Sequence, residues 1–176
     1  LMAGGWTPSI HLWSHSKGSI RWSDDWGAFL PDKPNENVRC VGACAGNWSF
    51  GQGINLGQLP TPKDPSTIKA FVDFQNDVTA KDIALAVREG YRSVEHIKRY
   101  TTNGMATDQG KTSNLNALQL ASGFLDKPIE AVGLTTFRPP YTPQSFGAFA
   151  GHAKDALFQP TRKTPIDSWA EEQGAV

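Results

Sequence analysis

The chain has 176 residues, and its 17 basic and 17 acidic side chains give a formal net charge of zero at pH 7. Nucleic-acid binding depends on an excess of positive charge, so the balanced charge and the lack of a basic patch with interleaved aromatic residues disfavour it. We expect no membrane span, because no apolar run reaches about 18 residues, and the two cysteines favour a reducing, cytoplasmic setting over a disulfide-stapled secreted module.

Residues 1–59 are rich in glycine and contain five of the six tryptophans: Trp6, Trp13, Trp22, Trp26 and Trp48. Tryptophans bury large areas, and the segment has few regular runs long enough to enclose them. We therefore expect it to pack against another part of a longer polypeptide. The first five residues, Leu-Met-Ala-Gly-Gly, are typical of a buried strand that enters a glycine turn, and they favour the same interpretation. An independent small protein with unusual ends is the alternative.

Within this segment, the stretch from Val38 to Gly46 is predicted to be a strand that leads into a glycine turn, with a helix starting near Ser49. In nucleotide-binding α/β domains such a turn brings backbone amides close to a phosphate or ribose. The signal is weak by spacing alone, because the stretch does not contain GxGxxG.

Two pairs of potential metal ligands also occur here. Cys40 and Cys44 have no histidine or further cysteine nearby, which is a poor zinc or iron–sulfur signature, and we predict a structural role for them. His11 and His15 have helical spacing, but Pro8 and the intervening residues favour an extended or turn segment. We therefore do not expect a metal site at the histidines.

A proline-rich linker, residues 60–68, separates this segment from a small helical domain, residues 69–125. An extended lead-in from Lys69 to Asp77 is predicted to precede three helices. The first has Thr79 as N-cap with Asp82 completing a capping box, and Gly90 ends it. The second opens at Ser93, with Val94 and Ile97 on one side, and the third runs from about Ser113 to Ala121 and ends at Gly123, with its leucines in the core.

Two segments are candidates for binding. The loop from Asn103 to Ser113 is polar and glycine-bearing, as binding loops often are, and its last residues precede a helix N-terminus, which favours anions. The second segment is the stretch Phe137–Pro143, whose prolines hold Arg138 and Tyr141 rigid, which suits anion or ring recognition. For the loop a solvated turn, and for the proline segment a crossover strapped onto a neighbouring domain, remain alternatives.

The order of residues from Val78 to Asn114, with Gly104-Met105 and Gln109-Gly110-Lys111 in the loop, resembles the small helical domain of bacterioferritin-associated ferredoxin. That domain also occurs in the α subunits of amine-oxidising and amino-acid-oxidising flavoenzymes. In the ferredoxin pattern, a Cys-x-Cys pair and two loop cysteines hold an iron–sulfur cluster. The residues at or near these places here are Asp73, Gln75, Asp108 and Ser113. Because a cluster needs thiolates, the resemblance implies a copy without iron and sulfur.

With the flanking phrases GGWTP and TTFRPPYTP, this cluster-less version resembles the α subunits of heterotetrameric sarcosine oxidases over essentially the whole chain. The resemblance implies a mixed α/β excerpt of five parts. They are the end of an NAD-binding domain (1–59), the linker (60–68), a small three-helix domain (69–125), an extended connector (126–153) and the start of an aminomethyltransferase-like, folate-binding domain (154–176).

Members of this family demethylate an N-methyl amine oxidatively at a flavin adenine dinucleotide held by the β subunit, and electrons pass to FMN at the α–β boundary. The resemblance implies partnership with that flavin-bearing β subunit and with smaller subunits, and it places no catalytic residue in this chain. The FMN-binding candidates are Gln109, Lys111, Thr112, Ser113, Arg138 and Tyr141.

The NAD-binding candidates are Gly42 and Ser49, although Ala43 stands where the commoner phrase has an acid. Tetrahydrofolate would be bound only by a domain beyond Val176. Two other functions remain open. One is a non-catalytic scaffold that bridges subunits, and the other is the α chain of a related opine, proline or dimethylglycine-type oxidoreductase.

Overall fold

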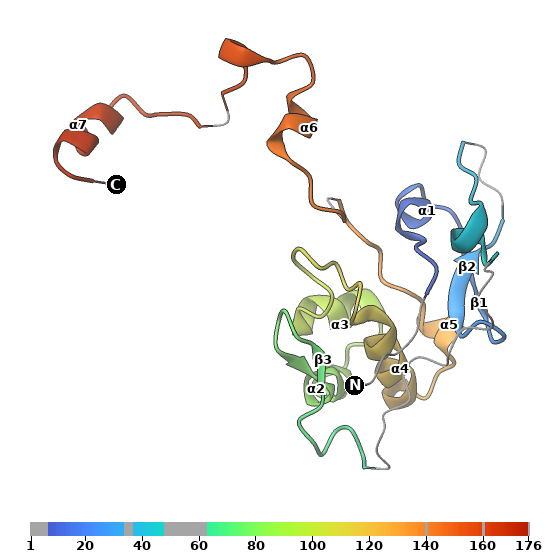
Figure 1. Ribbon diagram of the computed structural model, residues 1–176. Helices are drawn as coiled ribbons and strands as arrows, with labels where there is room; N and C mark the ends of the chain where they lie inside the picture. The colour runs from blue at the N-terminus through green and yellow to red at the C-terminus, as the bar shows by residue number, and fades with distance from the viewer. Residues whose placement is uncertain (1–6, 34–36, 48–62, 140, 160, 176) are drawn as a thin grey trace, which may run out of the picture. The chain divides into compact units, whose positions relative to one another are not determined.

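The computed structural model describes residues 7–33, 37–47, 63–139, 141–159 and 161–175. The chain divides into two compact units, Leu1–Tyr141 (unit 1) and Thr142–Val176 (unit 2), which are described separately (Figure 1). Among the described residues, no helix has both the length and the apolar character needed to cross a membrane.

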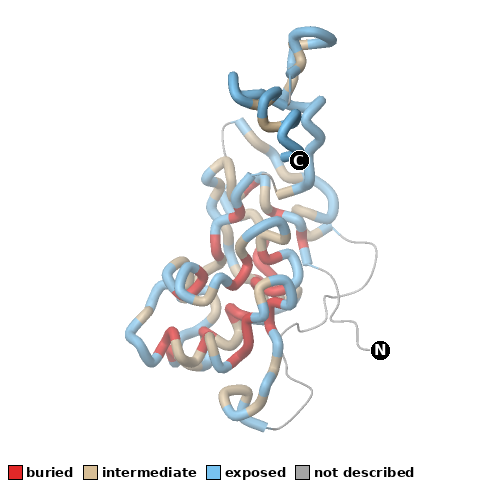
Figure 2. The backbone as a smooth tube through the Cα atoms, turned by 90° about the vertical axis from the view of Figure 1, so that its left-hand side faces the viewer, coloured by how far each residue is buried: buried red, intermediate tan, exposed pale blue. Residues whose placement is uncertain are grey.

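Three helices form one half of unit 1. They are α2 (Ala80–Arg88), α3 (Val94–Thr101) and α4 (Asn114–Leu125). Helix α2 packs against both of the others, and apolar side chains of all three, among them Ile83, Ile97 and Ala121, form one buried cluster. Figure 2 shows the buried residues gathered in the interior of this unit. The three helices predicted in this part of the sequence are thus present.

Local capping signals fixed the ends of α2 as predicted. The Thr79 amide and hydroxyl both donate to Asp82 Oδ2 at 2.7 Å, which closes the capping box. At the other end Gly90 takes a positive φ of 99°, and the Tyr91 amide bonds the carbonyl of Ala86 at 3.1 Å. Helix α3 begins after Ser93, also as predicted.

The prediction that Gly123 ends the third helix is wrong. Helix α4 continues through Gly123 to Leu125 and ends at Asp126, which has a φ of 52°. A glycine inside a helix costs about 1 kcal/mol relative to alanine. Burial of Leu125, only 8% exposed in the helical core, offsets this cost by about 1.5–3 kcal/mol.

The extended lead-in is one strand of a hairpin. Strand β3 (Phe71–Asp73) pairs antiparallel with β4 (Val78–Thr79), with Phe71 opposite Thr79 and Asp73 opposite Val78. The pairing places Val72 and Val78 in the same core as the helices.

The other half of unit 1 comes from the tryptophan-rich segment. Its elements are α1 (His11–His15), β1 (Ile20–Ser23), β2 (Ala28–Pro31) and the 3-10 helix η1 (Gly42–Ala45), and β1 and β2 form an antiparallel hairpin. Trp13 is 3% exposed and packs in a second cluster with Phe29 and Leu118. This tryptophan is therefore covered by unit 1 itself, because Leu118 of α4 packs in the same cluster.

Two sequence predictions in this segment are wrong. His11 to His15 form a helix, not an extended or turn segment, because Trp13 in its middle is held by burial and by its indole N–H, which donates to the Ser19 carbonyl at 2.8 Å. The predicted strand from Val38 is reduced to one bridge residue. Gly42, with a φ of 67°, turns the backbone into η1 before a strand can extend.

The connector after α4 is only partly extended. Ile129–Val132 form a short helix, α5, where an extended segment was expected, because the Pro128 carbonyl accepts hydrogen bonds from the amides of Ala131 and Val132 at 3.0 and 3.2 Å. Gly133, with a φ of 77°, ends it. Residues 133–139 and Tyr141 then follow without regular structure, and this segment is called the strap below.

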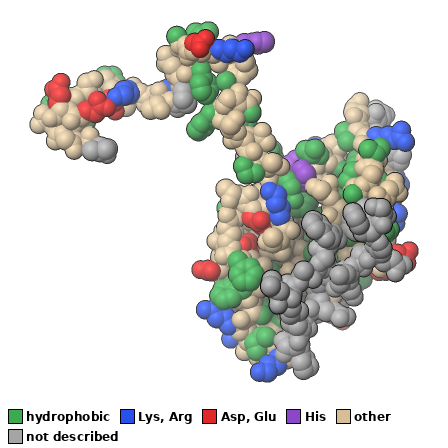
Figure 3. All heavy atoms as spheres, in the orientation of Figure 1, with side chains coloured by type: hydrophobic (Ala, Val, Ile, Leu, Met, Phe, Trp, Pro, Cys, Tyr) green, Lys and Arg blue, Asp and Glu red, His purple; other side chains and the backbone are tan. Residues whose placement is uncertain are grey.

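Unit 2 contains α6 (Phe146–Ala150), the 3-10 helix η2 (Asp155–Leu157) and α7 (Asp167–Glu172). The Lys163 ammonium lies 3.0 Å from Asp167 and 2.6 Å from Glu171. These ion pairs join the segment that precedes α7 to the helix itself. Apolar side chains, including Phe146, Phe149 and Trp169, are more than half exposed within this unit. Figure 3 shows hydrophobic side chains on its surface.

Candidate functional site

The loop from Asn103 to Ser113, called the glycine loop here, folds around the side chain of Asn114. Gly104 and Gly110 both have positive φ, 69° and 75°. A Cβ atom at either position would overlap the Asn114 side chain. The Asn114 amide bonds the Gly110 carbonyl at 3.0 Å, and its Nδ2 bonds the Gln109 carbonyl at 3.3 Å. Glycine is therefore required at both positions for the loop to close on Asn114.

The β3–β4 hairpin holds the other side of the glycine loop. The Gly104 amide donates to Asp73 Oδ2 at 2.8 Å. Gln75 donates from Nε2 to the Thr107 hydroxyl at 2.6 Å and accepts from the Asp108 amide at 3.0 Å. Of the positions at or near which the resembled ferredoxin carries cysteines, Gln75 and Asp108 are thus joined directly, and Asp73 bonds Gly104 of the loop instead.

Asp73 is a buried carboxylate, 2% exposed, at the centre of this junction. Besides Gly104, it accepts hydrogen bonds from the Gln75 amide and from the amide and side chain of Asn76 at 2.9–3.1 Å. Burial raises the pKa of Asp73, but the hydrogen bonds outweigh it and hold the pKa below its usual value. The carboxylate is therefore ionised at neutral pH and fixes the loop electrostatically.

The structure brings the two candidate binding segments together. Gln109 Oε1 accepts a hydrogen bond from the Arg138 amide at 2.9 Å. The Lys111 ammonium donates to the Tyr141 carbonyl at 2.6 Å and lies 4.4 Å from the centre of the Tyr141 ring. The glycine loop and the strap therefore form one surface that carries Lys111, Arg138 and Tyr141.

Helix α3 holds the strap through two side-chain hydrogen bonds to the backbone of Thr136. Glu95 Oε1 accepts from the Thr136 amide at 2.6 Å, and the Lys98 ammonium donates to the Thr136 carbonyl at 3.2 Å. Both backbone groups of one strap residue are thus bonded to side chains one helical turn apart. This grip holds Arg138, two residues further on, in a defined position.

His11 also belongs to the site, and sequence reasoning missed it. Its ring stacks on Tyr141 with centroids 3.8 Å apart and an angle of 21° between the planes. Burial, followed by the positive charges of His15 and Lys111, lowers the pKa of His11. The spacing of His11 and His15 suggested only a metal pair, and no local pattern signals a partner on a distant segment.

The six FMN-binding candidates differ in what they can reach. Lys111, Thr112 and Arg138 are exposed, and Tyr141 is half-buried. Ser113 has 0% exposure, so its hydroxyl does not reach this surface. The side-chain amide of Gln109 is engaged at both ends, by Arg138 and by the Ala106 carbonyl at 2.8 Å, which suits it to orient Arg138.

The two NAD-binding candidates are not part of the surface formed by the glycine loop and the strap. Gly42 begins η1 without the preceding strand, and Ser49 lies outside the described residues. Cys40 and Cys44 are free thiols, and burial, followed by the neighbouring Cys44, raises the pKa of Cys40. Within the described ranges, no group of three or more His, Cys, Asp or Glu residues is arranged to hold a metal ion.

Comparison with known proteins relates the chain to one enzyme family. Residues 67–152 match the family model described as "Sarcosine oxidase A3 domain". The chain is 43% identical to "Sarcosine oxidase subunit alpha" of Rhizobium meliloti (strain 1021), in an alignment covering 99% of this chain and 21% of the relative. It is 35% identical to the protein of the same name from Corynebacterium sp. (strain P-1), with 99% and 22% covered. The chain thus spans about a fifth of the length of these relatives.

Among solved structures, L-proline dehydrogenase from P. horikoshii matches with a TM-score of 0.60 and 17% sequence identity. The match covers 80% of this chain and 37% of that chain. At this identity the similarity concerns the fold alone. The mixed arrangement of helices and hairpins in this chain resembles part of the proline dehydrogenase structure.

Proposed function

Because the chain belongs to the sarcosine oxidase α-subunit family, we propose that it is part of a multi-subunit oxidoreductase that demethylates an N-methyl amine. In this proposal the amine is oxidised on a flavin-bearing partner subunit, and this part of the α subunit carries no catalytic residue. Its role is to provide one wall of a second flavin site at the boundary between the subunits.

The observation that carries this proposal is the junction of the glycine loop and the strap. An FMN phosphate is a dianion that needs cations and hydroxyl donors. Lys111, Arg138 and the Thr112 hydroxyl provide both kinds of group from two adjacent exposed segments. The stacked rings of His11 and Tyr141 beside them provide an aromatic surface. The residues present therefore fit a flavin mononucleotide.

The flavin would supply the redox chemistry, and this chain's residues would bind and orient it. Lys111 and Arg138 would neutralise phosphate charge. Gln109 and the grip on Thr136 would keep Arg138 in place. A backbone that is already held in place loses little conformational entropy when Arg138 binds an anion, so these contacts would favour binding.

The FMN content of the assembled enzyme tests this role. We expect Lys111→Ala and Arg138→Ala each to weaken FMN binding about tenfold or more, the effect of losing one charge-assisted contact. The control is Lys81→Ala, which removes an exposed lysine of α2. Normal FMN content and reoxidation rate in both test variants would remove the two cations from the site.

A subunit-bridging scaffold is the second candidate function. Phe74 is 76% exposed and Phe71 is 39% exposed, and their rings stack with centroids 5.9 Å apart on the β3–β4 hairpin. Figure 3 shows hydrophobic side chains at the surface where β3 lies. We expect Phe74→Ala to weaken assembly with the partner subunits if this hairpin bridges them. Lys111→Ala would leave assembly intact in that case.

NAD and tetrahydrofolate remain proposals for the longer protein, and the relationship to the α-subunit family supports them. Gly42 offers a backbone amide at a left-handed turn, which suits close approach of a nucleotide. Release of nucleotide from the full-length protein after Gly42→Val, measured by its absorbance, tests whether this turn contributes.

A further inference from the structure

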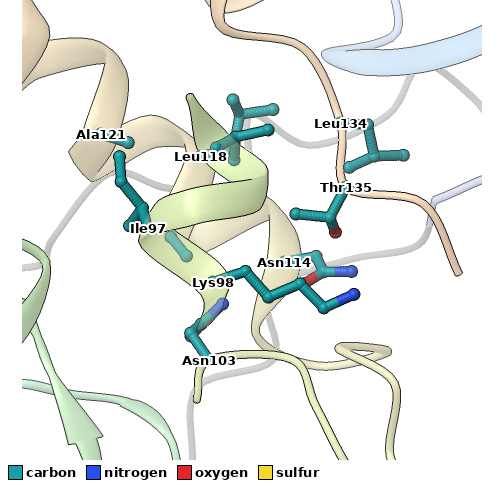
Figure 4. Close-up of a pocket in the computed structure, with 10 residues that line it drawn as sticks. Ile97, Lys98, Asn103, Asn114, Leu118, Ala121, Leu134 and Thr135 are labelled. Carbon is teal, nitrogen blue, oxygen red and sulfur yellow. The ribbon is translucent and has the colours of Figure 1, made fainter. Parts of the chain in front are cut away.

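A small cavity lies at the base of the glycine loop, between α3, α4 and the strap. It has a volume of about 10 Å³. Apolar side chains of α3 and α4 cover one side. Figure 4 shows the polar ends of Lys98, Asn114 and Thr135 on the other side, with Asn103 at the lower left beside the end of α3. The four polar residues come from four segments: Lys98 from α3, Asn103 from the start of the loop, Asn114 from the start of α4 and Thr135 from the strap.

All four polar side chains are more than nine-tenths buried, with exposures of 6% for Lys98, 3% for Asn103, 6% for Asn114 and 5% for Thr135. Within the described part of the chain, three of their oxygen atoms have no hydrogen-bond partner: Asn103 Oδ1, Asn114 Oδ1 and Thr135 Oγ1. The Lys98 ammonium carries three donors, and one of them bonds the Thr136 carbonyl. The cavity therefore faces a set of hydrogen-bonding groups that the protein chain itself does not satisfy.

The composition of this set limits what can bind. The positive charge of Lys98 disfavours a metal cation. The unpaired amide oxygens of Asn103 and Asn114, two residues of its lining, disfavour an anion. A water molecule needs a cavity of at least about 10–15 Å³ and two to four polar partners, and this cavity meets the lower limit.

We propose that the cavity binds a single water molecule. It accepts hydrogen bonds from Lys98 Nζ and the Thr135 hydroxyl, and it donates to Asn103 Oδ1 and Asn114 Oδ1. Two donors and two acceptors complete its tetrahedral coordination, and every unsatisfied oxygen gains a partner. The same water solvates the buried ammonium, whose pKa is lowered by burial.

The bound water joins both ends of the glycine loop to α3 and to the strap. It acts as a structural bridge at the point where the loop leaves the helical core. This role does not depend on the flavin proposal, because none of the four ligands is among the FMN-binding candidates. The two proposals can fail separately.

Crystal structures of the full-length protein in its complete assembly test the occupant. We expect one isolated density peak at hydrogen-bonding distance from all four polar atoms, and no anomalous peak there after a sodium bromide soak. An anomalous bromide peak would assign the site to an anion and overturn the proposal. Direct contact between Lys98 and the two asparagines without intervening density would overturn it as well.

Hydrogen exchange tests the bridging role. Thr135→Val keeps the shape of the side chain and removes one ligand of the water. We expect the amides of residues 103–113 to exchange about tenfold faster in this variant, the effect of losing one hydrogen bond. Thr136→Val is the matched control, because this neighbouring threonine side chain is exposed. Equal exchange rates in the two variants would contradict the bridge.

Discussion

The ammonium of Lys111 donates to the backbone carbonyl of Tyr141 at 2.6 Å while it lies 4.4 Å from the centre of the same residue's ring. One side chain of the glycine loop thus contacts both the backbone and the ring of one strap residue. The charge of Lys111 also helps to lower the pKa of His11, whose ring stacks on the ring of Tyr141. The three residues form a coupled group, and the coupling can be measured.

The pKa of His11 should rise when Lys111 is replaced by methionine. The lysine charge is one of the causes that lower the His11 pKa, after burial and the charge of His15. Removing it eases protonation, and an NMR pH titration of the imidazole would record the change. Arg92→Met, which removes an exposed cation from the α2–α3 connection, is the control. An identical His11 pKa in both variants would show that Lys111 does not act on the ring.

Stability should depend on pH through His11. Its pKa is lowered in the folded state, so below its ordinary pKa of about 6.5 the unfolded chain binds more protons. The free energy of unfolding should therefore fall as pH decreases from about 6.5 towards the lowered value. Urea unfolding between pH 5 and 7 measures this slope. In His11→Gln the contribution of this group to the slope should disappear.

Replacement of Asp73 by alanine should destabilise unit 1 by about 2–4 kcal/mol, because it leaves the Gly104 amide and the Asn76 groups without their buried acceptor. Chemical unfolding measures the loss. Asp77→Ala, which removes an exposed turn carboxylate of the same hairpin, is the control. A similar loss in the free energy of unfolding in both variants would show that burial of the Asp73 carboxylate adds no stability.

Low pH should remove the stabilisation that the ionised Asp73 carboxylate provides. The pKa of Asp73 is held below the ordinary value of 3.8, so its stabilisation is present above that pH and is lost as pH falls through the lowered value. The amides of the glycine loop should then exchange faster in wild-type protein below pH 3.8, after correction for intrinsic rates. Asp73→Asn, which is neutral at every pH, should not show this extra change.

Two glycine-to-alanine changes should have opposite effects. Gly110→Ala should destabilise by about 2 kcal/mol or more, because the residue has a φ of 75° and its Cβ would overlap Asn114. Gly123→Ala should stabilise by about 0.5–1 kcal/mol, because this residue is inside α4 and its Cβ would meet no atom within 4 Å. Thermal unfolding compares them directly, and destabilisation by Gly123→Ala would contradict the continuous helix.

Sequence reasoning predicted the parts of the fold that local chemistry determines. The Thr79–Asp82 box and the Gly90 stop act within a few residues of each other, so the limits of α2 were readable from the chain. It failed where burial decides. Helix α1 depends on Trp13 reaching the second core, and the end of α4 depends on Leu125 reaching the first.

The same division applies to the candidate site. Sequence patterns picked out the glycine loop and the strap separately, because polarity, glycine and proline are local signals. Their junction depends on Gln109 and Lys111 meeting residues about 30 positions away, and contacts of that range leave no local pattern. The buried position of Ser113 and the participation of His11 were hidden for the same reason.

The grip of α3 on Thr136 has a mechanical consequence. A residue bonded through only one of its two backbone polar groups can still pivot about that bond. Thr136 is bonded through its N–H by Glu95 and through its carbonyl by Lys98, so any sliding of the strap must break both bonds together. We therefore expect α3 and the strap around Thr136 to move together, so that a displacement of α3 is passed along the strap to Arg138.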